Sequence, residues 1–176
     1  ILGVNMGHVG FLAEFESFQI DEAIRRVATH DYSIDERMIA HVDVWLPGTT
    51  KPIEDWALND ITLERADRGK MVELSIRVDD VEMNSFGADG VILATPTGST
   101  AYAFSAGGPV MWPNVKALQL IPLAAHALFA RPLIIGSGST FTIDILDESM
   151  SEGWICCDGR RQRALPQGTR VMVRES

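Results

Sequence analysis

The sequence predicts a mainly β protein: a sandwich-like antiparallel β domain with a few helices, preceded by the last βα unit of an incomplete α/β domain. Two observations predict this fold class. Beyond residue 32, apolar residues recur at every second position, and glycine or proline interrupts these runs at short intervals. Before that point, an apolar run, a glycine-rich turn and a segment with helical periodicity follow one another. We therefore expect two parts, residues 1–31 and residues 32–176.

The first part has the pattern of a strand, a turn and a helix. Residues 1–4 form a short apolar run, typical of the end of a buried parallel strand, and the glycine-punctuated residues 5–10 follow. Apolar residues then recur at helical spacing: Phe18, Ile20, Ala23, Ile24 and Val27. Because a single βα unit cannot cover its own apolar faces, we expect its structural neighbours in sequence that precedes Ile1.

The second part has the alternation of half-buried antiparallel strands. Residues 38–46, 72–78 and 141–145 each place apolar side chains on one face. Asp79 and Asp80 are typical of a hairpin tip, and Gly168 separates the last two strands. Many short strands with such turns favour a β sandwich.

The composition excludes several classes of function. A net charge of -9 opposes the basic balance that a nucleic-acid backbone requires, so we expect no nucleic-acid partner. No apolar stretch approaches the roughly 20 residues of a membrane-spanning helix, and the first residues do not have the pattern of a secretory signal. We expect a soluble, cytoplasmic protein with no membrane partner.

The cysteines and histidines predict neither a disulfide nor a metal site. Cys156 and Cys157 are adjacent, and neighbouring positions on a strand point to opposite faces, so a bond between them would be strained. The four histidines share no ligand-like spacing with these cysteines. We expect two reduced thiols and no metal held by the protein.

Residues 89–109 are the strongest candidate for a binding site. An apolar strand runs into small hydroxyl residues and glycine, and then into a possible helix that begins near Ser99 or Thr100. Such a strand end presents backbone N–H groups and hydroxyls to phosphate, ribose or a nucleobase edge. A hydroxyl-rich turn with a Ser or Thr N-cap has the same composition. The residues alone leave both interpretations open.

Five motifs, in the same order, resemble those of the NAD kinases. Residues 89–109 are similar to the family's D-G, apolar strand, T-P-T-G-S-T-A-Y and S-x-G-G-P signature, and residues 3–12 are similar to its G-x-N-x-G-x-x-G-F-L turn. Residues 57–60 resemble A-L-N-E, and residues 126–132 and 157–159 supply two further matches. The chain thus resembles the C-terminal portion of a bacterial-type NAD kinase dependent on ATP or polyphosphate.

That resemblance implies a phosphotransferase. NAD is the substrate, and ATP with Mg²⁺, or polyphosphate, supplies the phosphoryl group that the 2′-hydroxyl receives to give NADP. It also implies a homo-oligomer, a dimer or a tetramer, with parts of the site formed across subunits.

The resemblance further implies which residues bind the dinucleotide. Asn59 and Asp60 match a pair that contacts ribose hydroxyls, although Asp60 replaces the usual Glu and so has a shorter reach; a simple turn is the alternative. Phe11 and Leu12 match an apolar pair that covers a base, and Asp89 matches a polar contact.

Other matches surround these positions. The stretch that wraps the nicotinamide and ribose side comprises Thr97, Thr100, Ala101, Tyr102 and Ser105. Ala124 matches a small residue beside the ligand, with a core position as the alternative. Lys70 and Arg160 fall at polar or basic contacts, with solvated surface cations as the alternative.

No residue of this chain matches the catalytic aspartate of the family. That residue belongs to a G-G-D-G-T loop, which this sequence does not contain, so we expect it upstream of Ile1 and expect the chain alone to be inactive. Asp158-Gly159 is instead predicted to be a hairpin turn.

Two other functions stay open at this stage. One is a lipid kinase of the diacylglycerol or sphingosine kinase type, which the acidic charge and the lack of an amphipathic membrane face disfavour. The other is a non-catalytic dinucleotide-binding module. The sequence before Ile1 would discriminate between them and a NAD kinase.

Overall fold

The computed structural model describes residues 2–7, 13–127 and 130–176. The chain divides into two compact units, Ile1–Glu36 and Arg37–Ser176. This division lies five residues beyond the expected one between residues 31 and 32, because residues 31–39 form neither helix nor strand.

The first unit contains the predicted strand and helix. Strand β1 (Val4–Asn5) pairs in parallel with β2 (Phe15–Glu16), and a 3₁₀ turn, η1 (Ser17–Gln19), leads into helix α1 (Ile20–Ala28). Strand β2 has no counterpart in the sequence prediction, since two residues carry no periodic pattern.

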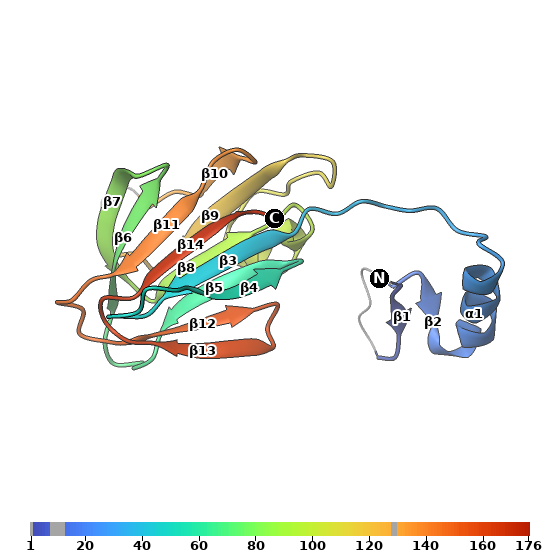
Figure 1. The fold of residues 1–176 in the computed structure, drawn as a ribbon, viewed down its shortest axis with the longest axis horizontal. Helices are drawn as coiled ribbons and strands as arrows, with labels where there is room; N and C mark the ends of the chain where they lie inside the picture. The colour runs from blue at the N-terminus through green and yellow to red at the C-terminus, as the bar shows by residue number, and fades with distance from the viewer. Residues whose placement is uncertain (1, 8–12, 128–129) are drawn as a thin grey trace. The chain divides into compact units, whose positions relative to one another are not determined.

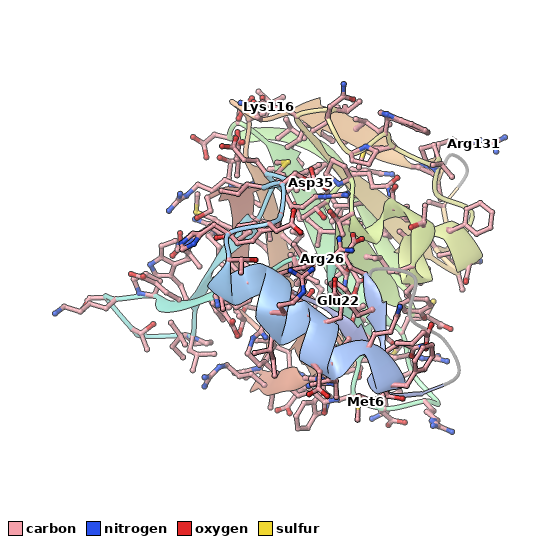
Figure 2. All side chains as sticks on the ribbon, turned by 90° about the vertical axis from the view of Figure 1, so that its right-hand side faces the viewer. Met6, Glu22, Arg26, Asp35, Lys116 and Arg131 are labelled. Carbon is pink, nitrogen blue, oxygen red and sulfur yellow. The ribbon has the colours of Figure 1, made fainter. Side chains whose placement is uncertain are left out.

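Helix α1 separates its charged and apolar residues as predicted. On the charged side, Glu22 forms ion pairs with Arg25 at 2.7 Å and Arg26 at 2.8 Å. Figure 2 labels Glu22 and Arg26 on this helix. On the apolar side, Ile20 and Ile24 are 39% and 62% exposed, and only Ala23 is buried. The described residues of the first unit therefore do not cover the apolar stripe of their own helix.

The second unit is a sandwich of two six-stranded antiparallel sheets (Figure 1). In sheet I the strand order is β10 (Leu133–Gly136), β9 (Ala117–Leu123), β8 (Gly90–Ala94), β5 (Asp60–Arg65), β12 (Gly153–Cys157), β13 (Arg161–Leu165). In sheet II the order is β4 (Ile53–Ala57), β3 (Ala40–Trp45), β14 (Arg170–Glu175), β11 (Phe141–Ile145), β6 (Val72–Val78), β7 (Val81–Ala88). The predicted fold class is confirmed.

The core lies between the inner faces of the two sheets, where the predicted alternation places it. Side chains of β3, β6 and β11 that were expected on one face are buried in a single cluster with those of β5, β8 and β12. Examples are Val42, Leu74, Phe141, Ile61 and Leu93, all 0% exposed. The period of two in the sequence therefore determined which side of each strand faces inward.

Two hairpin tips have the expected backbone. Asp79 and Asp80 join β6 to β7 with φ of 48° and 67°, and Asp158 and Gly159 join β12 to β13 with φ of 50° and 67°. Two consecutive residues with positive φ are the requirement of the tight turn that matches the twist of paired strands. Both predicted hairpins are confirmed.

The two thiols are free, as expected. Cys157 lies in the core, where burial raises the pKa of its thiol to about 12, whereas Cys156 on the outer face of sheet I is half-buried. None of the described helices is long and apolar enough to span a membrane.

Candidate functional site

The candidate site lies on the outer face of sheet I. That face presents Asp60, Thr62 and Glu64 from β5, because their neighbours Ile61 and Leu63 point into the core. A small apolar cluster on the same face packs helix α2 (Tyr102–Ser105) against β8 and β9; its buried members are Ile92, Ala94, Ala103 and Ile121. The hydroxyl-rich segment therefore sits on this face, beside the start of β5.

A bend at Asn59 is the centre of the site. The Asn59 carbonyl accepts a hydrogen bond from the Thr95 backbone N–H at 3.0 Å, and the Thr95 hydroxyl donates to the Leu58 carbonyl at 2.5 Å. Gly98 packs directly on this bend, since a Cβ at that position would lie 1.9 Å from the Asn59 carbonyl oxygen. Only glycine permits so close an approach, which explains the glycine of the T-P-T-G-S-T motif physically.

The Asp158 carboxylate holds the same bend through hydrogen bonds to its backbone N–H groups. Its Oδ1 accepts the backbone N–H of Asn59 at 2.7 Å, and its Oδ2 accepts that of Leu58 at 3.0 Å. A third N–H, of Asp60, lies 3.4 Å from Oδ1. The bend is thus held by its backbone, and the side-chain amide of Asn59 has no partner among the residues that the structure describes.

Asp60 is a mostly buried residue whose carboxylate has no partner among the described residues. It is 7% exposed, and within the described part of the chain it makes neither a hydrogen bond nor an ion pair. Burial, together with the nearby negative charge of Asp158, raises its pKa from 3.8 to about 6. A buried carboxylate that the protein leaves unpaired is costly, and such groups concentrate at functional sites.

The predicted contacts extend along β5 from this bend. At the far end of the strand, Arg65 forms an ion pair with Asp89 at 3.0 Å and donates to the Lys70 carbonyl at 3.3 Å. The Lys70 ammonium itself pairs with Asp67 at 3.5 Å. Six strand residues span roughly 17 Å, so Asn59 and Asp89 mark the two ends of an extended surface.

Tyr102 lies between the two ends. Its pKa is raised by partial burial, then by the charges of Glu64, Asp60 and Asp89. Tyr102 therefore lies within electrostatic range of carboxylates from both ends of β5. The structure places Asn59 and Asp60 at one end of β5 and Asp89 at the other, with Tyr102 on the helix that packs against the same face.

The hydroxyl-rich segment forms less helix than expected. A 3₁₀ turn, η2 (Gly98–Thr100), precedes the four residues of α2. Inside it, the fully buried Ser99 hydroxyl donates to the Pro96 carbonyl at 2.7 Å and accepts the Met111 backbone N–H at 2.9 Å. Thr97 is buried, whereas Thr100, Ala101, Tyr102 and Ser105 are exposed. The hydrogen bonds of the buried Ser99 hydroxyl therefore hold the segment in place, and its exposed residues face solvent.

The remaining predicted residues have separate settings. Ala124 follows β9 and is exposed rather than in the core, with a φ of 46° that alanine rarely adopts. Arg160 follows the Asp158-Gly159 turn and is exposed, with no ion-pair partner within the described ranges. Phe11 and Leu12 lie outside the described residues.

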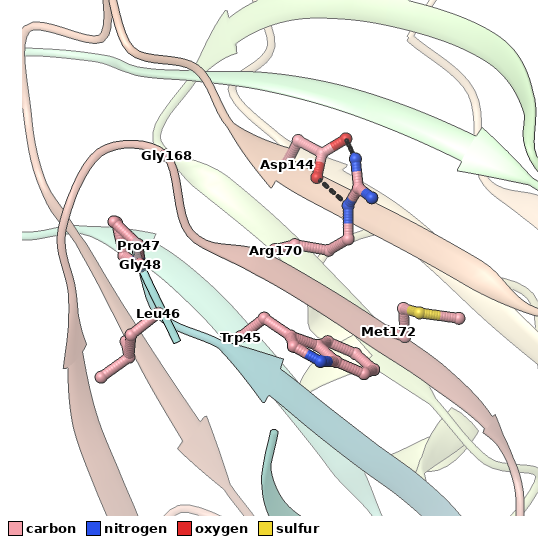
Figure 3. Close-up of a pocket in the computed structure, with 8 residues that line it drawn as sticks. All are labelled: Trp45, Leu46, Pro47, Gly48, Asp144, Gly168, Arg170 and Met172. Atoms are coloured by element: carbon pink, nitrogen blue, oxygen red, sulfur yellow. Dashed lines mark hydrogen bonds and ion pairs between the residues drawn. The ribbon is translucent and has the colours of Figure 1, made fainter. Parts of the chain in front are cut away.

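Two cavities of the second unit lie elsewhere. One, of about 420 Å³, is on the outer face of sheet II between Trp45, Arg170 and Met172 (Figure 3). The other, of about 250 Å³, opens between β4 and β13 at the edge of the sandwich and is lined by Asp55 and Arg161, among others. None of the predicted binding residues lines either cavity. The candidate site is therefore separate from both cavities.

Sequence reasoning missed three residues that build the site. Asp158 and Ser99 hold the two backbone segments, and Arg65 orients Asp89. Motif matching pointed to the positions of the first two, but not to their bonds, because their partners lie far away in the sequence. Arg65 carried no signal beyond its charge.

The chain is similar to known proteins over its whole length. Residues 58–176 match the family model described as the ATP-NAD kinase C-terminal domain. All 176 residues are 98% identical to the NAD kinase of Bifidobacterium longum subsp. infantis and 51% identical to that of Leifsonia xyli subsp. xyli. The chain spans about half the length of these curated relatives, 52% and 58% respectively.

Two solved structures share the fold. A yeast NADH kinase complexed with NADH is 31% identical, with a TM-score of 0.89 over 99% of this chain and 50% of its own. An NAD kinase from Archaeoglobus fulgidus in complex with ATP is 26% identical, with a TM-score of 0.77 over 99% of this chain and 64% of its own.

Proposed function

Since this chain belongs to the ATP-NAD kinase C-terminal domain family, we propose that the complete protein transfers a phosphoryl group to the 2′-hydroxyl of NAD and so forms NADP. ATP supplies the phosphoryl group, and inorganic polyphosphate is the alternative donor. This chain supplies mainly the surface that binds NAD.

The unpaired carboxylate of Asp60 carries the proposal. Asp60 is 7% exposed, and its carboxylate has no partner in the described part of the chain, beside an Asn59 amide that is also unengaged. Vicinal ribose hydroxyls are two donors at the spacing that one carboxylate accepts. Their binding would stabilise the charged form of Asp60, lower its raised pKa and so offset the cost of its burial.

The other predicted residues complete the surface. We place the nicotinamide and ribose side against the exposed residues of the segment from Thr97 to Ser105, which include Tyr102. Asp89 and Lys70 bind polar groups at the far end, Phe11 and Leu12 cover a base, and Ala124 leaves room for the ligand. Arg160 approaches the phosphates or the 2′ position.

The chemistry itself belongs to parts outside these 176 residues. We assign the base that takes the hydroxyl proton to an aspartate upstream of Ile1. Mg²⁺ neutralises charge on the donor phosphates when it is bound. No three His, Cys, Asp or Glu side chains of the described residues come together to hold a metal ion, so we assign the ion to the donor. We further propose a cytoplasmic homo-oligomer.

The test compares two aspartates in the complete protein. We expect purified protein with NAD, ATP and Mg²⁺ to form NADP, and we expect Asp60→Asn to raise the KM for NAD at least tenfold. Asp43→Asn is the matched control: Asp43 is 8% exposed on the outer face of sheet II. It loses the same charge but should keep the KM of the parent. Equal KM values for both variants, or no NADP from the parent, would contradict the proposal.

A further inference from the structure

One arginine joins the two sheets at the open edge of the sandwich. Arg161 begins β13 of sheet I, and its Nε donates to Oδ1 of Asp55, on β4 of sheet II, at 2.9 Å. Its Nη2 donates to the Trp56 carbonyl, and its guanidinium carbon lies 4.6 Å from the centroid of the Trp56 ring. Figure 1 shows β4 beside β12 and β13 at this edge. Arg161 is therefore fixed on two sides by sheet II.

The same guanidinium reaches the carboxylate that holds the Asn59 bend. Arg161 Nη2 donates to Asp158 Oδ2 at 3.2 Å, and that oxygen also accepts the Leu58 N–H at 3.0 Å. The other oxygen, Oδ1, accepts the Asn59 N–H at 2.7 Å. The chain of contacts therefore runs from β4 through Arg161 and Asp158 to the bend.

The charges favour this link. Asp158 lies close enough to Asp60 for its charge to contribute to the raised pKa of Asp60. Without a cation on its other side, the Asp158 carboxylate would gain by turning away from Asp60 toward water, since 16% of its side chain is already exposed. The N–H groups of Leu58 and Asn59 would then lose their acceptor.

We propose that Arg161 is a positioning residue for NAD: it holds the Asp158 carboxylate in place and, through it, the Asn59–Asp60 bend in the conformation that binds the ligand. The role in NAD binding rests on the proposed function; the role in holding the bend does not. Arg161 is suited to it because a planar guanidinium serves two carboxylates and a ring at once, which an ammonium does not.

A neighbouring arginine offers a matched control. Arg163 lies two residues further along β13 and is exposed, and it has no carboxylate partner in the portion of the chain that the structure covers. Arg163→Ala removes the same charge from the same strand and leaves the Asp158 carboxylate untouched.

The experiment uses the complete protein and two readouts. The first is amide hydrogen exchange of residues 58–60 without ligand, and the second is the Kd for NAD by calorimetry. We expect Arg161→Ala to speed the exchange of these amides and to weaken NAD binding about tenfold, which equals about 1.4 kcal/mol. Arg161→Lys should give an intermediate result, and Arg163→Ala should match the parent. The lysine variant serves alone if Arg161→Ala does not fold.

Each outcome decides a part of the proposal. Unchanged exchange at residues 58–60 would overturn it, whatever the Kd. Faster exchange with an unchanged Kd would overturn the role in NAD binding. A parent protein that neither binds nor phosphorylates NAD would refute the proposed function and, with it, that role, while the exchange data would still show whether Arg161 holds the bend.

Discussion

Asp60 on sheet I and Asp43 on sheet II lie on the outer faces of the same sandwich and are almost equally buried, at 7% and 8% exposed. Asp43 accepts from His41 Nε2 at 3.0 Å and pairs with Arg174 at 3.5 Å. Asp60 has neither kind of partner within the described residues. Strands of sheet II therefore supply hydrogen-bond and ion-pair partners for Asp43, whereas the described strands of sheet I supply none for the Asp60 carboxylate.

A second acid on the outer face of sheet II is also paired. Asp144 accepts from Arg170 at 2.7 Å in a bidentate pair (Figure 3), and Arg77 lies 3.9 Å away. A buried acid without a hydrogen-bond donor in the protein can instead accept hydrogen bonds from a bound ligand. This difference distinguishes the candidate site from an equally polar surface.

The largest expected effect concerns the split between binding and chemistry. If Asp60 binds NAD and the base lies elsewhere, the 176-residue chain alone should turn over NAD at background level, since a missing base costs about 10²- to 10⁴-fold. NADP formation from NAD, ATP and Mg²⁺ is measured beside the complete protein, with NAD affinity checked separately. Comparable turnover would make Asp60, Asp89 and Asp158 candidates for the base.

The next effect concerns the unengaged amide beside Asp60. Asn59→Ala should weaken NAD binding by about 1 to 3 kcal/mol, the scale of a lost hydrogen bond with a polar or charged partner. Its melting temperature should change little, because Thr95, Gly98 and Asp158 hold the backbone of this residue and not its side chain. Calorimetric titration measures the Kd, and an unchanged value in a folded variant would remove Asn59 from the site.

The two aspartates should respond oppositely in stability. At pH 7, Asp60→Asn should stabilise the fold by on the order of 2 kcal/mol, because it removes an unpaired buried charge. Asp43→Asn should destabilise it by about 1 kcal/mol, because it weakens two charge-assisted contacts. Denaturant unfolding of the variants measures both changes, and shifts of the same sign would refute the contrast between the two sheets.

The pH dependence of stability should show that the charge of Asp60 causes the stability gain of Asp60→Asn. Its pKa is about 6 in the folded chain, against an ordinary value of 3.8 for an aspartate in water. The favourable contribution of the protonated acid is therefore full below pH 3.8 and is lost as the pH rises through about 6. The stability gain of Asp60→Asn should accordingly be near zero at about pH 4 and complete by about pH 7. A gain independent of pH would assign it to packing.

The smallest effect concerns Arg160, which follows the turn beside Asp60. A cation near the 2′ position favours binding of NADP over NAD. Arg160→Ala should therefore lower the affinity for NADP relative to that for NAD a few-fold, on the scale of one exposed charge pair. Titrations with each dinucleotide give this ratio. If it equals that of the parent, Arg160 is a surface cation.

The sequence by itself determined the faces of the strands and the tips of the hairpins. Alternation at Val42, Leu74 and Phe141 predicted burial because a strand turns each successive side chain to the opposite face. The pairs at Asp79 and Asp158 predicted turns because few residues tolerate positive φ. The ordered motifs also indicated the family. These signals are local, so one chain without relatives was sufficient to find them.

Only the tertiary structure decided how the site is held. Asp158 bonds to the Asn59 N–H across 99 residues of sequence, and Arg161 bonds to Asp55 across 106. No periodicity or spacing encodes such contacts, since they depend on which strands become neighbours in two different sheets. The same holds for Asp60. Its sequence neighbours predict its place at the start of a strand, but its lack of a partner depends on which side chains the other strands place on that face.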